Sequence, residues 1–142
     1  MNSKVAAVTD AETRNPMRVV LIDDSEDIRE VLRLALNREE SFTIVGEASD
    51  GEAGVAAVRA HQPHLVILDI ALPVMDGLQA LQLIRAESPE SIVIVLTGFP
   101  EEAVALSAVE QGAHGYIRKG GGVPELVGQI REILQLRSKG EH

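Results

Sequence analysis

The feature that most constrains this chain is a short apolar run, residues 65–68, that ends abruptly at the carboxylate of Asp69. Four consecutive apolar residues are typical of a strand that is buried on both faces of a parallel sheet. Turn-forming residues follow, and apolar residues then recur at helical spacing at Leu78, Leu81 and Ile84. The run therefore predicts a strand and a covering helix, with Asp69 at the carboxyl end of the strand, where ligands gather in open α/β sheets.

Four other apolar segments predict four more strands, over residues 18–22, 42–47, 91–98 and 115–118. The second strand of the five alternates apolar and polar residues and the last one is short, so both are expected at the edges of the sheet. Four more helices are predicted where apolar residues recur at helical spacing. The residues that mark them are Ile28, Val31, Leu32, Ala35 and Leu36; Val55 and Val58; Ala103, Val104, Leu106 and Val109; and Leu126, Val127, Ile130, Ile133 and Leu134.

Five strands alternating with five helices predict an α/β fold: a flavodoxin-like, doubly wound, five-stranded parallel sheet with helices on two faces. Two edge strands around three apolar strands match the order 2-1-3-4-5, in which the topological switch point lies between strands one and three. Asp23-Asp24 and Asp69 follow those two strands. Thr97 ends strand four and Lys119 follows strand five, so all of these polar groups are expected at one edge of the sheet.

The entrance of the last helix has a weak sequence signal. Pro124 suits a first helical position, which leaves Val123 at the cap. A cap without a side-chain oxygen costs about 1 kcal/mol, so this helix is expected to fray at its start.

The size and composition limit the classes of protein to which the chain can belong. A length of 142 residues, with 45% hydrophobic and 25% charged residues, is typical of one globular domain. The net charge of -9 opposes direct binding to nucleic acid or to an anionic membrane surface. The chain has no cysteine, no signal pattern and no apolar run long enough to span a bilayer. A soluble, cytoplasmic protein is therefore expected.

The three carboxylates predicted at the switch point require a cation among them. At an effective dielectric constant of about 20, each close pair of carboxylates repels by roughly 4 kcal/mol. Mg²⁺ is the expected cation, because it binds one or two carboxylates, a backbone carbonyl and water, and leaves room for a phosphoryl oxygen. An aspartate facing Mg²⁺ can attack phosphorus and form an aspartyl phosphate. Lys119 and the hydroxyl of Thr97 would then stabilise the phosphoryl oxygens.

Each of these residues also has a purely structural interpretation when it is taken alone. Asp24 or Ser25 could cap the first helix, and Asp69 could be a turn residue at a strand end. Thr97 could be an ordinary β-branched strand residue, and Lys119 a solvated turn residue. Their combination at one switch point favours the functional interpretation. The histidines show no metal-ligand spacing and are interpreted as surface residues: His61, His64, His114 and His142.

Four segments together resemble the signatures of the response-regulator receiver domain. They are Asp23-Asp24, residues 68–77 (LDIALPVMDG), residues 96–98 (LTG) and residues 112–119 (GAHGYIRK). Each is weak alone, but all four occur in order and at the spacing of the family, and the resemblance covers about residues 17–138. Residues 1–16 are then a mobile leader and residues 139–142 a tail. Residues 45–51 (VGEASDG) are similar to receivers of the subfamily that usually carries a C-terminal helix-turn-helix.

The resemblance implies that Asp69 is the phosphoacceptor and takes a phosphoryl group from a histidine kinase or a phosphotransfer protein. It implies that Asp24, Asp69 and the backbone carbonyl of Ala71 bind Mg²⁺ directly, while Asp23 acts through water. Lys119 is implied to pair with the phosphoryl group. Such a domain is not an enzyme, beyond catalysing its own phosphoryl transfer and slow autodephosphorylation.

The resemblance also implies a switch and a slow hydrolysis step. Thr97 and Tyr116 would form the switch, in which the hydroxyl moves toward the phosphate and the aromatic ring follows it inward. Ala71 and Phe99 would border the path of the hydrolytic water, and neither side chain can hydrogen-bond water, so a long-lived phosphorylated state is expected. The switch would change a protein-binding surface for a downstream target or a missing output domain, and a phosphorylation-dependent dimer is compatible with it.

Two other functions remain open from the residues alone. An aspartate-nucleophile, Mg²⁺-dependent phosphatase would have a second acid two residues after Asp69, where this chain has Ala71. A flavodoxin-like nucleotide or flavin binder would have a phosphate-binding loop after strand one, where this chain has the acidic segment 23–27. Both a stand-alone receiver and a fragment of a longer regulator are compatible with the sequence.

Overall fold

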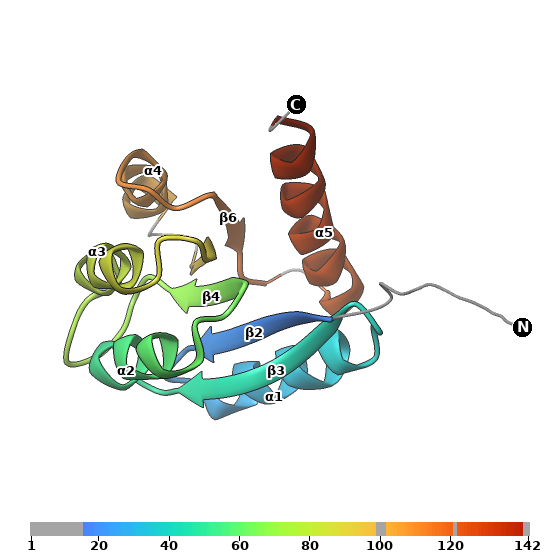
Figure 1. Ribbon diagram of the computed structural model, residues 1–142, viewed down its shortest axis with the longest axis horizontal. Coiled ribbons are helices and arrows are strands. Elements are labelled where there is room, and N and C mark those ends of the chain that lie inside the picture. The colour runs from blue at the N-terminus through green and yellow to red at the C-terminus, as the bar shows by residue number, and fades with distance from the viewer. Residues whose placement is uncertain (1–15, 99–101, 121, 141–142) are drawn as a thin grey trace, which may run out of the picture.

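The computed structural model describes residues 16–98, 102–120 and 122–140, within which strands and helices alternate (Figure 1). The strands are β2 (Met17–Ile22), β3 (Phe42–Ala48), β4 (Leu65–Asp69), β5 (Ile92–Thr97) and β6 (Gly115–Arg118). The helices are α1 (Glu26–Asn37), α2 (Gly51–His61), α3 (Gly77–Glu87), α4 (Glu102–Glu110) and α5 (Val123–Gly140). The last helix thus includes residues 139–140 of the predicted tail, whereas residues 1–15 of the predicted leader lie outside the described residues. No helix in these ranges is long and apolar enough to cross a membrane.

The five strands form one parallel sheet in the spatial order β3-β2-β4-β5-β6. Numbered from the first of these strands along the chain, this is the order 2-1-3-4-5, so the predicted doubly wound α/β fold is confirmed. The two strands predicted at the edges, β3 and β6, lie there. The pairing of β2 with β3 contains one irregularity, because consecutive residues Val19 and Val20 pair with Ile44 and Gly46.

Two aliphatic core layers lie on either side of the sheet. Helices α1 and α5 pack on one face through Leu32, Leu36 and Ile130, and α2, α3 and α4 pack on the other face (Figure 1). The residues of β4 alternate between the two layers, and all five are buried. This arrangement explains why residues 65–68 show no polar alternation, since both faces of the strand meet apolar side chains.

Helix α4 buries a different face from the one that its larger apolar residues suggest. Val104, Leu106 and Val109 are 40%, 52% and 38% exposed, whereas Ala105 and Ala108 are fully buried. The residues that mark this helix in the sequence therefore do not form its core face. Apolar residues surround the whole helix, so their spacing cannot select the buried side.

The entrance of α5 differs from the prediction. Val123 is the first helical residue rather than the cap, and Gly122 precedes the helix. The carboxylate of Glu125 accepts a hydrogen bond from the backbone N–H of Gly122 at 2.7 Å. This contact resembles the return half of a capping box and satisfies the N–H of the residue that precedes the helix. Glycine is a better helix cap than valine, so the cost expected for a valine cap does not apply.

Two histidines extend the hydrogen bonding of the sheet at its amino-terminal edge. The Nδ1 atoms of His64 and His114 accept hydrogen bonds from the backbone N–H groups of Arg18 and Val93, both at 2.9 Å. The surface interpretation is wrong for His114, which is half-buried, and this burial lowers its pKa to about 4, assisted by the nearby Arg137 and Arg85 charges. His61 and His64 are exposed as predicted, and His142 lies outside the described residues.

Candidate functional site

Three aspartates meet at the switch point of the sheet. Asp69 is the last residue of β4, Asp23 directly follows the neighbouring strand β2, and Asp24 comes next in the loop to α1. One carboxylate oxygen of each lies within 4.8 Å of the others. Asp23 and Asp69 are both 1% exposed, whereas Asp24 is exposed. The structure thus brings together the three acids predicted from the sequence.

Backbone groups hold the two buried carboxylates. Oδ1 of Asp23 accepts a hydrogen bond from the N–H of Ser25 at 2.9 Å, and Oδ1 of Asp69 accepts one from the N–H of Ala71 at 3.1 Å. Ser25, rather than Asp24, caps α1, because its side chain accepts from the N–H of Ile28 at 3.2 Å. Capping therefore does not account for the second acid of the Asp23-Asp24 pair.

Lys119 supplies a positive charge to this group of acids. Its Nζ lies 3.2 Å from Oδ2 of Asp23 and 3.2 Å from Oδ1 of Asp69. Its backbone N–H donates to the carbonyl of Thr97 at 2.8 Å, which ties the residue to the end of β5. Burial alone would lower the pKa of Lys119, but the charges of Asp23 and Asp69 outweigh burial and raise it. The lysine therefore stays charged, and one ammonium faces three carboxylates.

The arrangement fits a hard divalent cation. Oδ2 of Asp23 is buried and makes no hydrogen bond within the described part of the chain, although the Lys119 ammonium lies near it. A buried carboxylate oxygen without a hydrogen bond is costly, and a cation with oxygen ligands would remove that cost. Carboxylate oxygens are the ligands that Mg²⁺ prefers in proteins. The acidic cluster is thus consistent with a magnesium site.

The carboxyl group of Asp69 is difficult to ionise without such a cation. Burial raises its pKa to about 6, and the charge of Asp23 adds to this effect. The N–H of Ala71 and the Lys119 ammonium act in the opposite direction. Near neutral pH the carboxylate is therefore ionised but carries an unrelieved desolvation cost.

The two predicted switch residues lie on adjacent strands. Thr97 is fully buried at the end of β5, and its hydroxyl donates to the carbonyl of Gly98 at 3.1 Å rather than to the acids. Tyr116 pairs with Val95 in the register of β5 and β6, and its partly buried ring packs against one core layer. The structure thus places the hydroxyl at the end of β5 and the ring on the adjacent strand, at the register position of Val95.

The loop between β4 and α3 forms the rim of the site beside Asp69. Gly77 closes this loop by donating its N–H to the carbonyl of Ile70 at 3.1 Å. A Cβ at Gly77 would lie 2.5 Å from the Cα and the carbonyl oxygen of Ile70, so only glycine fits. Val74 has a φ of 72° and is 82% exposed. Positive φ is unfavourable for a β-branched residue, so the loop is strained at Val74.

Of the two residues predicted to border the hydrolytic water, only Ala71 lies in the described part of the chain. Ala71 is exposed next to the acids, and its side chain offers no hydrogen bond to water. Phe99 lies outside the described residues. The prediction for this pair therefore rests on the resemblance and on the position of Ala71.

Sequence reasoning missed Arg29, which lies on the first turn of α1. Its Nη1 donates to the backbone carbonyl of Asp23 at 2.6 Å. Its Nε donates to the carboxylate of Glu47 on β3 at 3.2 Å. The available signal is its place one helical turn after the cap Ser25, because helical side chains lean toward the helix N-terminus.

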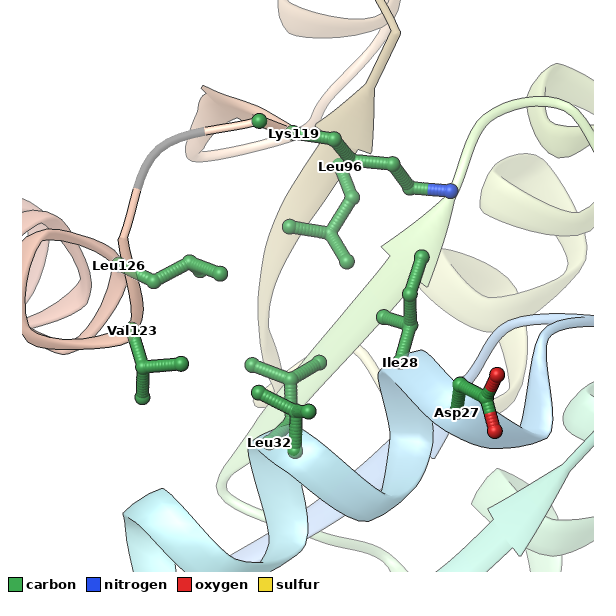
Figure 2. Close-up of a pocket in the computed structure, with 9 residues that line it drawn as sticks. Asp27, Ile28, Leu32, Leu96, Lys119, Val123 and Leu126 are labelled. Atoms are coloured by element: carbon green, nitrogen blue, oxygen red, sulfur yellow. The ribbon is translucent and has the colours of Figure 1, made fainter.

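A small apolar pocket of about 200 Å³ lies beside the site, between α1 and the start of α5. Figure 2 shows the methylene chain of Lys119 along one edge of the pocket-lining side chains, with its nitrogen near the tip of β4. The pocket therefore touches the lysine chain while the ammonium belongs to the acidic cluster. The aliphatic residues that line it include Ile28, Leu32, Leu96, Val123 and Leu126.

The sequence of this chain is similar to those of known proteins. The family model for the response regulator receiver domain matches residues 19–131. The chain is 36% identical over 117 residues to chemotaxis protein CheY of Halobacterium salinarum, covering 82% of this chain and 96% of that protein. It is 35% identical over 121 residues to the probable transcriptional regulatory protein NarL of Mycobacterium tuberculosis, covering 85% of this chain and 56% of that protein.

Other relatives are considerably longer than this chain. It spans 29% of protein-glutamate methylesterase/protein-glutamine glutaminase 2 of Methanosarcina mazei, at 40% identity over 75% of this chain. It spans 47% of transcriptional regulatory protein YdfI of Bacillus subtilis, at 32% identity over 72% of this chain. The matched segment is therefore shared by proteins that differ in the rest of their length.

Solved structures show the same architecture. The signal receiver domain of the putative response regulator NarL from Mycobacterium tuberculosis matches with a TM-score of 0.75 and 33% identity, covering 82% of this chain and 94% of that chain. CheY in the CheX-CheY-BeF3-Mg²⁺ complex from Borrelia burgdorferi matches with a TM-score of 0.79 and 26% identity, covering 87% of this chain and 92% of that chain. The second similarity extends to a protein whose structure was determined with a phosphoryl mimic and Mg²⁺.

Proposed function

This chain belongs to the response-regulator receiver family, the phosphoacceptor domains of two-component signalling, and we propose that Asp69 is its phosphoacceptor. The observation that carries the proposal is a buried carboxylate at the switch point, faced by two other acids and paired with Lys119. An oxygen of Asp69 attacks the phosphorus of a phosphohistidine on a histidine kinase or a phosphotransfer protein. The new O–P bond forms as the P–N bond breaks, and the histidine nitrogen keeps the electron pair.

Lys119 and Thr97 have roles that follow from their positions. The Lys119 ammonium already lies 3.2 Å from Asp69, so it can pair with a phosphoryl oxygen without crossing the site. The Thr97 hydroxyl has only to leave the carbonyl of Gly98 to donate to a second phosphoryl oxygen. Both contacts stabilise negative charge that develops during the transfer.

We assign the metal to the acidic cluster. Asp24, Asp69 and the carbonyl of Ala71 would bind Mg²⁺ directly, and Asp23 would act through water. Magnesium supplies positive charge that offsets the repulsion between donor phosphate and acids. Asp24 is the exposed member of the cluster, which gives an incoming ion access from the solvent.

The output is proposed to be a change in a protein-binding surface formed by α4, β6 and α5. Movement of Thr97 away from Gly98 would free space for the Tyr116 ring to turn inward. Helix α4 contacts β6 and carries three exposed apolar side chains, Val104, Leu106 and Val109. The partner that binds this surface would be a downstream protein, an output domain or a second copy of this chain. Amide shifts on adding beryllofluoride should concentrate between residues 97 and 135, and shifts confined to the surroundings of Asp69 would contradict this switch.

Several aspects of the biology rest on family membership. Receiver domains partner with kinases and phosphatases, and we propose that this chain does so in the cytoplasm. We propose no enzymatic activity beyond its own phosphoryl transfer and slow autodephosphorylation. Family membership removes the support for the phosphatase and the flavin binder as alternatives.

Slow loss of the phosphoryl group is a further part of the proposal. Hydrolysis needs a positioned water, and positioning supplies much of the catalysis in phosphoryl transfer. Neither Ala71 nor Phe99 can hold such a water. Replacing both, as Ala71→Asn with Phe99→Glu, should accelerate dephosphorylation while leaving magnesium affinity nearly unchanged. The rate of dephosphorylation is measured by intact mass at one Mg²⁺ concentration. A double variant that loses its phosphoryl group no faster than the wild type would refute this role.

The central assignment is tested by incubating the protein with acetyl phosphate and Mg²⁺ and measuring its intact mass. The wild type should gain one phosphoryl group, and Asp69→Asn should gain none. Asp76→Asn is the matched control, because Asp76 is an exposed aspartate that caps α3 and asparagine caps equally well. Phosphorylation of Asp69→Asn to the wild-type level would overturn the assignment.

A further inference from the structure

We propose that Arg29 is a positioning residue for the acidic site, acting through the main chain of Asp23, and that Glu47 in turn holds Arg29. This inference rests on the proposed magnesium site but not on which aspartate accepts the phosphoryl group. Neither residue touches the reacting atoms. Their proposed effect is on where the acids lie.

The backbone of Asp23 is held by hydrogen bonds from two different elements. The Asp23 N–H donates to the carbonyl of Ala48 at 3.0 Å, which anchors the loop to β3. Its carbonyl accepts from Nη1 of Arg29 at 2.6 Å, which anchors it to α1. Both hydrogen-bonding groups of the Asp23 backbone are thus engaged, from opposite sides.

The guanidinium of Arg29 is itself held in place by a second contact. Its side chain is only 15% exposed, and its Nε lies 3.2 Å from Oε1 of Glu47. A guanidinium can make both contacts because its donors diverge in one rigid plane, which an ammonium cannot reproduce. The chain of contacts from Glu47 through Arg29 to Asp23 therefore ties the edge strand β3 to the loop that carries the acids.

The charge of Glu47 has a second consequence for the site. Arg29 brings a positive charge close to carboxylates that are proposed to bind a cation, and by itself this charge would oppose cation binding. Glu47 pairs with the guanidinium of Arg29, and also with that of Arg33, so its negative charge offsets part of this effect. The contact thus reduces the positive charge that Arg29 brings beside the proposed metal site.

Arg33 offers a control within the same helix. It lies one helical turn after Arg29 and its Nη1 is 2.6 Å from Oε2 of the same Glu47. Its described hydrogen bond goes to Glu47, and it has none to Asp23. Replacement of Arg33 therefore removes a tether between α1 and β3 without removing the contact to the acidic loop.

The test is calorimetric titration of Mg²⁺ into the wild type, Arg29→Met, Arg29→Lys and Arg33→Met. Loss of a group that orients metal-binding residues typically weakens affinity by about tenfold or more, which we expect for Arg29→Met. Arg29→Lys should recover part of this loss, since lysine keeps the charge and can reach one partner. Arg33→Met should stay within about twofold of the wild type, as expected for a partly exposed ion pair.

Urea unfolding of the same variants in EDTA separates positioning from stability. A merely structural role predicts that Arg29→Met and Arg33→Met lose stability while both keep wild-type magnesium affinity, and this result overturns the proposal. Equal losses of affinity in the two variants, or tighter binding in Arg29→Met, would also overturn it. A wild type that binds no Mg²⁺ would refute both the metal site and this role, whereas phosphorylation of another residue with normal titrations would refute only the Asp69 assignment.

Discussion

Replacing Asp69 by asparagine should stabilise the metal-free protein. Burial raises the pKa of this carboxyl group from 3.8 to about 6. Each pH unit of such a shift corresponds to about 1.4 kcal/mol, so above pH 6 the ionised group destabilises the fold by up to about 3 kcal/mol. Asparagine has nearly the same shape and keeps an oxygen that can accept from the N–H of Ala71.

The measured gain should be smaller than this limit, at about 1–2 kcal/mol. Asp69 is paired with Lys119, and the substitution leaves that ammonium with Asp23 as its remaining partner. Loss of one ion pair offsets part of the relief that the substitution brings. The gain in stability of Asp69→Asn follows from the burial of the carboxylate. The lost ion pair reduces this gain but does not reverse it.

The pH dependence has a definite sign. Between pH 3.8 and about 6 the folded wild type binds more protons at Asp69 than the unfolded chain does, so its stability falls as the pH rises through this window. The advantage of Asp69→Asn should therefore be full at pH 7.5 and fall to about a third at pH 4.5. Magnesium should reverse the ranking, because a ligand at 100 times its dissociation constant stabilises the wild type by about 2.7 kcal/mol.

The assay is urea unfolding followed by circular dichroism, in EDTA at pH 7.5 and pH 4.5, and in Mg²⁺ at pH 7.5. Glu90→Gln is the control, because Glu90 is an exposed acid in a turn and its replacement removes the same charge. Its stability should stay within about 0.5 kcal/mol of the wild type. An Asp69→Asn protein that is no more stable than the wild type in EDTA at pH 7.5 would refute the argument.

Three other predictions follow from the same region. Asp24→Asn should weaken Mg²⁺ more than Asp23→Asn, because a direct ligand matters more than one acting through water, and equal losses in calorimetric titration would contradict the assigned roles. Gly77→Ala should lower the free energy of unfolding by more than about 2 kcal/mol, since a Cβ there meets the backbone of Ile70, and wild-type stability in urea would disprove that constraint. Val74→Gly should raise the free energy of unfolding by about 1 kcal/mol, because glycine adopts a positive φ without strain. A loss of stability would show that the loop is not strained at this position.

Much of the fold could be predicted because its main determinants are local. The run 65–68 is apolar throughout because β4 is covered on both faces, so burial appears directly in the sequence. The acids at positions 23, 24 and 69 could be placed together because parallel strands end at one edge of a sheet. The resemblance to receivers adds the proposed roles of individual residues, which spacing alone does not provide.

Other features depend on contacts between distant segments and have no local signal. Helix α4 is apolar on all sides, and only its packing against the sheet determines that Ala105 and Ala108 are buried. His114 is half-buried, and its ring accepts a hydrogen bond from the N–H of Val93 on β5, which is distant in the sequence. In each case the sequence specifies the chemistry of the side chain, but its environment comes from a different element.

In the acidic site, too, some features follow from the local sequence and others from contacts between elements. The sequence by itself determined a sheet with carboxylates at its switch point, because strand periodicity and chain order are encoded residue by residue. Only the tertiary structure decided how those acids are held: Lys119, directly after β6, bridges Asp23 and Asp69, and Arg29 joins the Asp23 carbonyl to Glu47. The contacts of Lys119 and of Glu47 link segments far apart in the chain, so they exist only once the sheet and its helices have assembled.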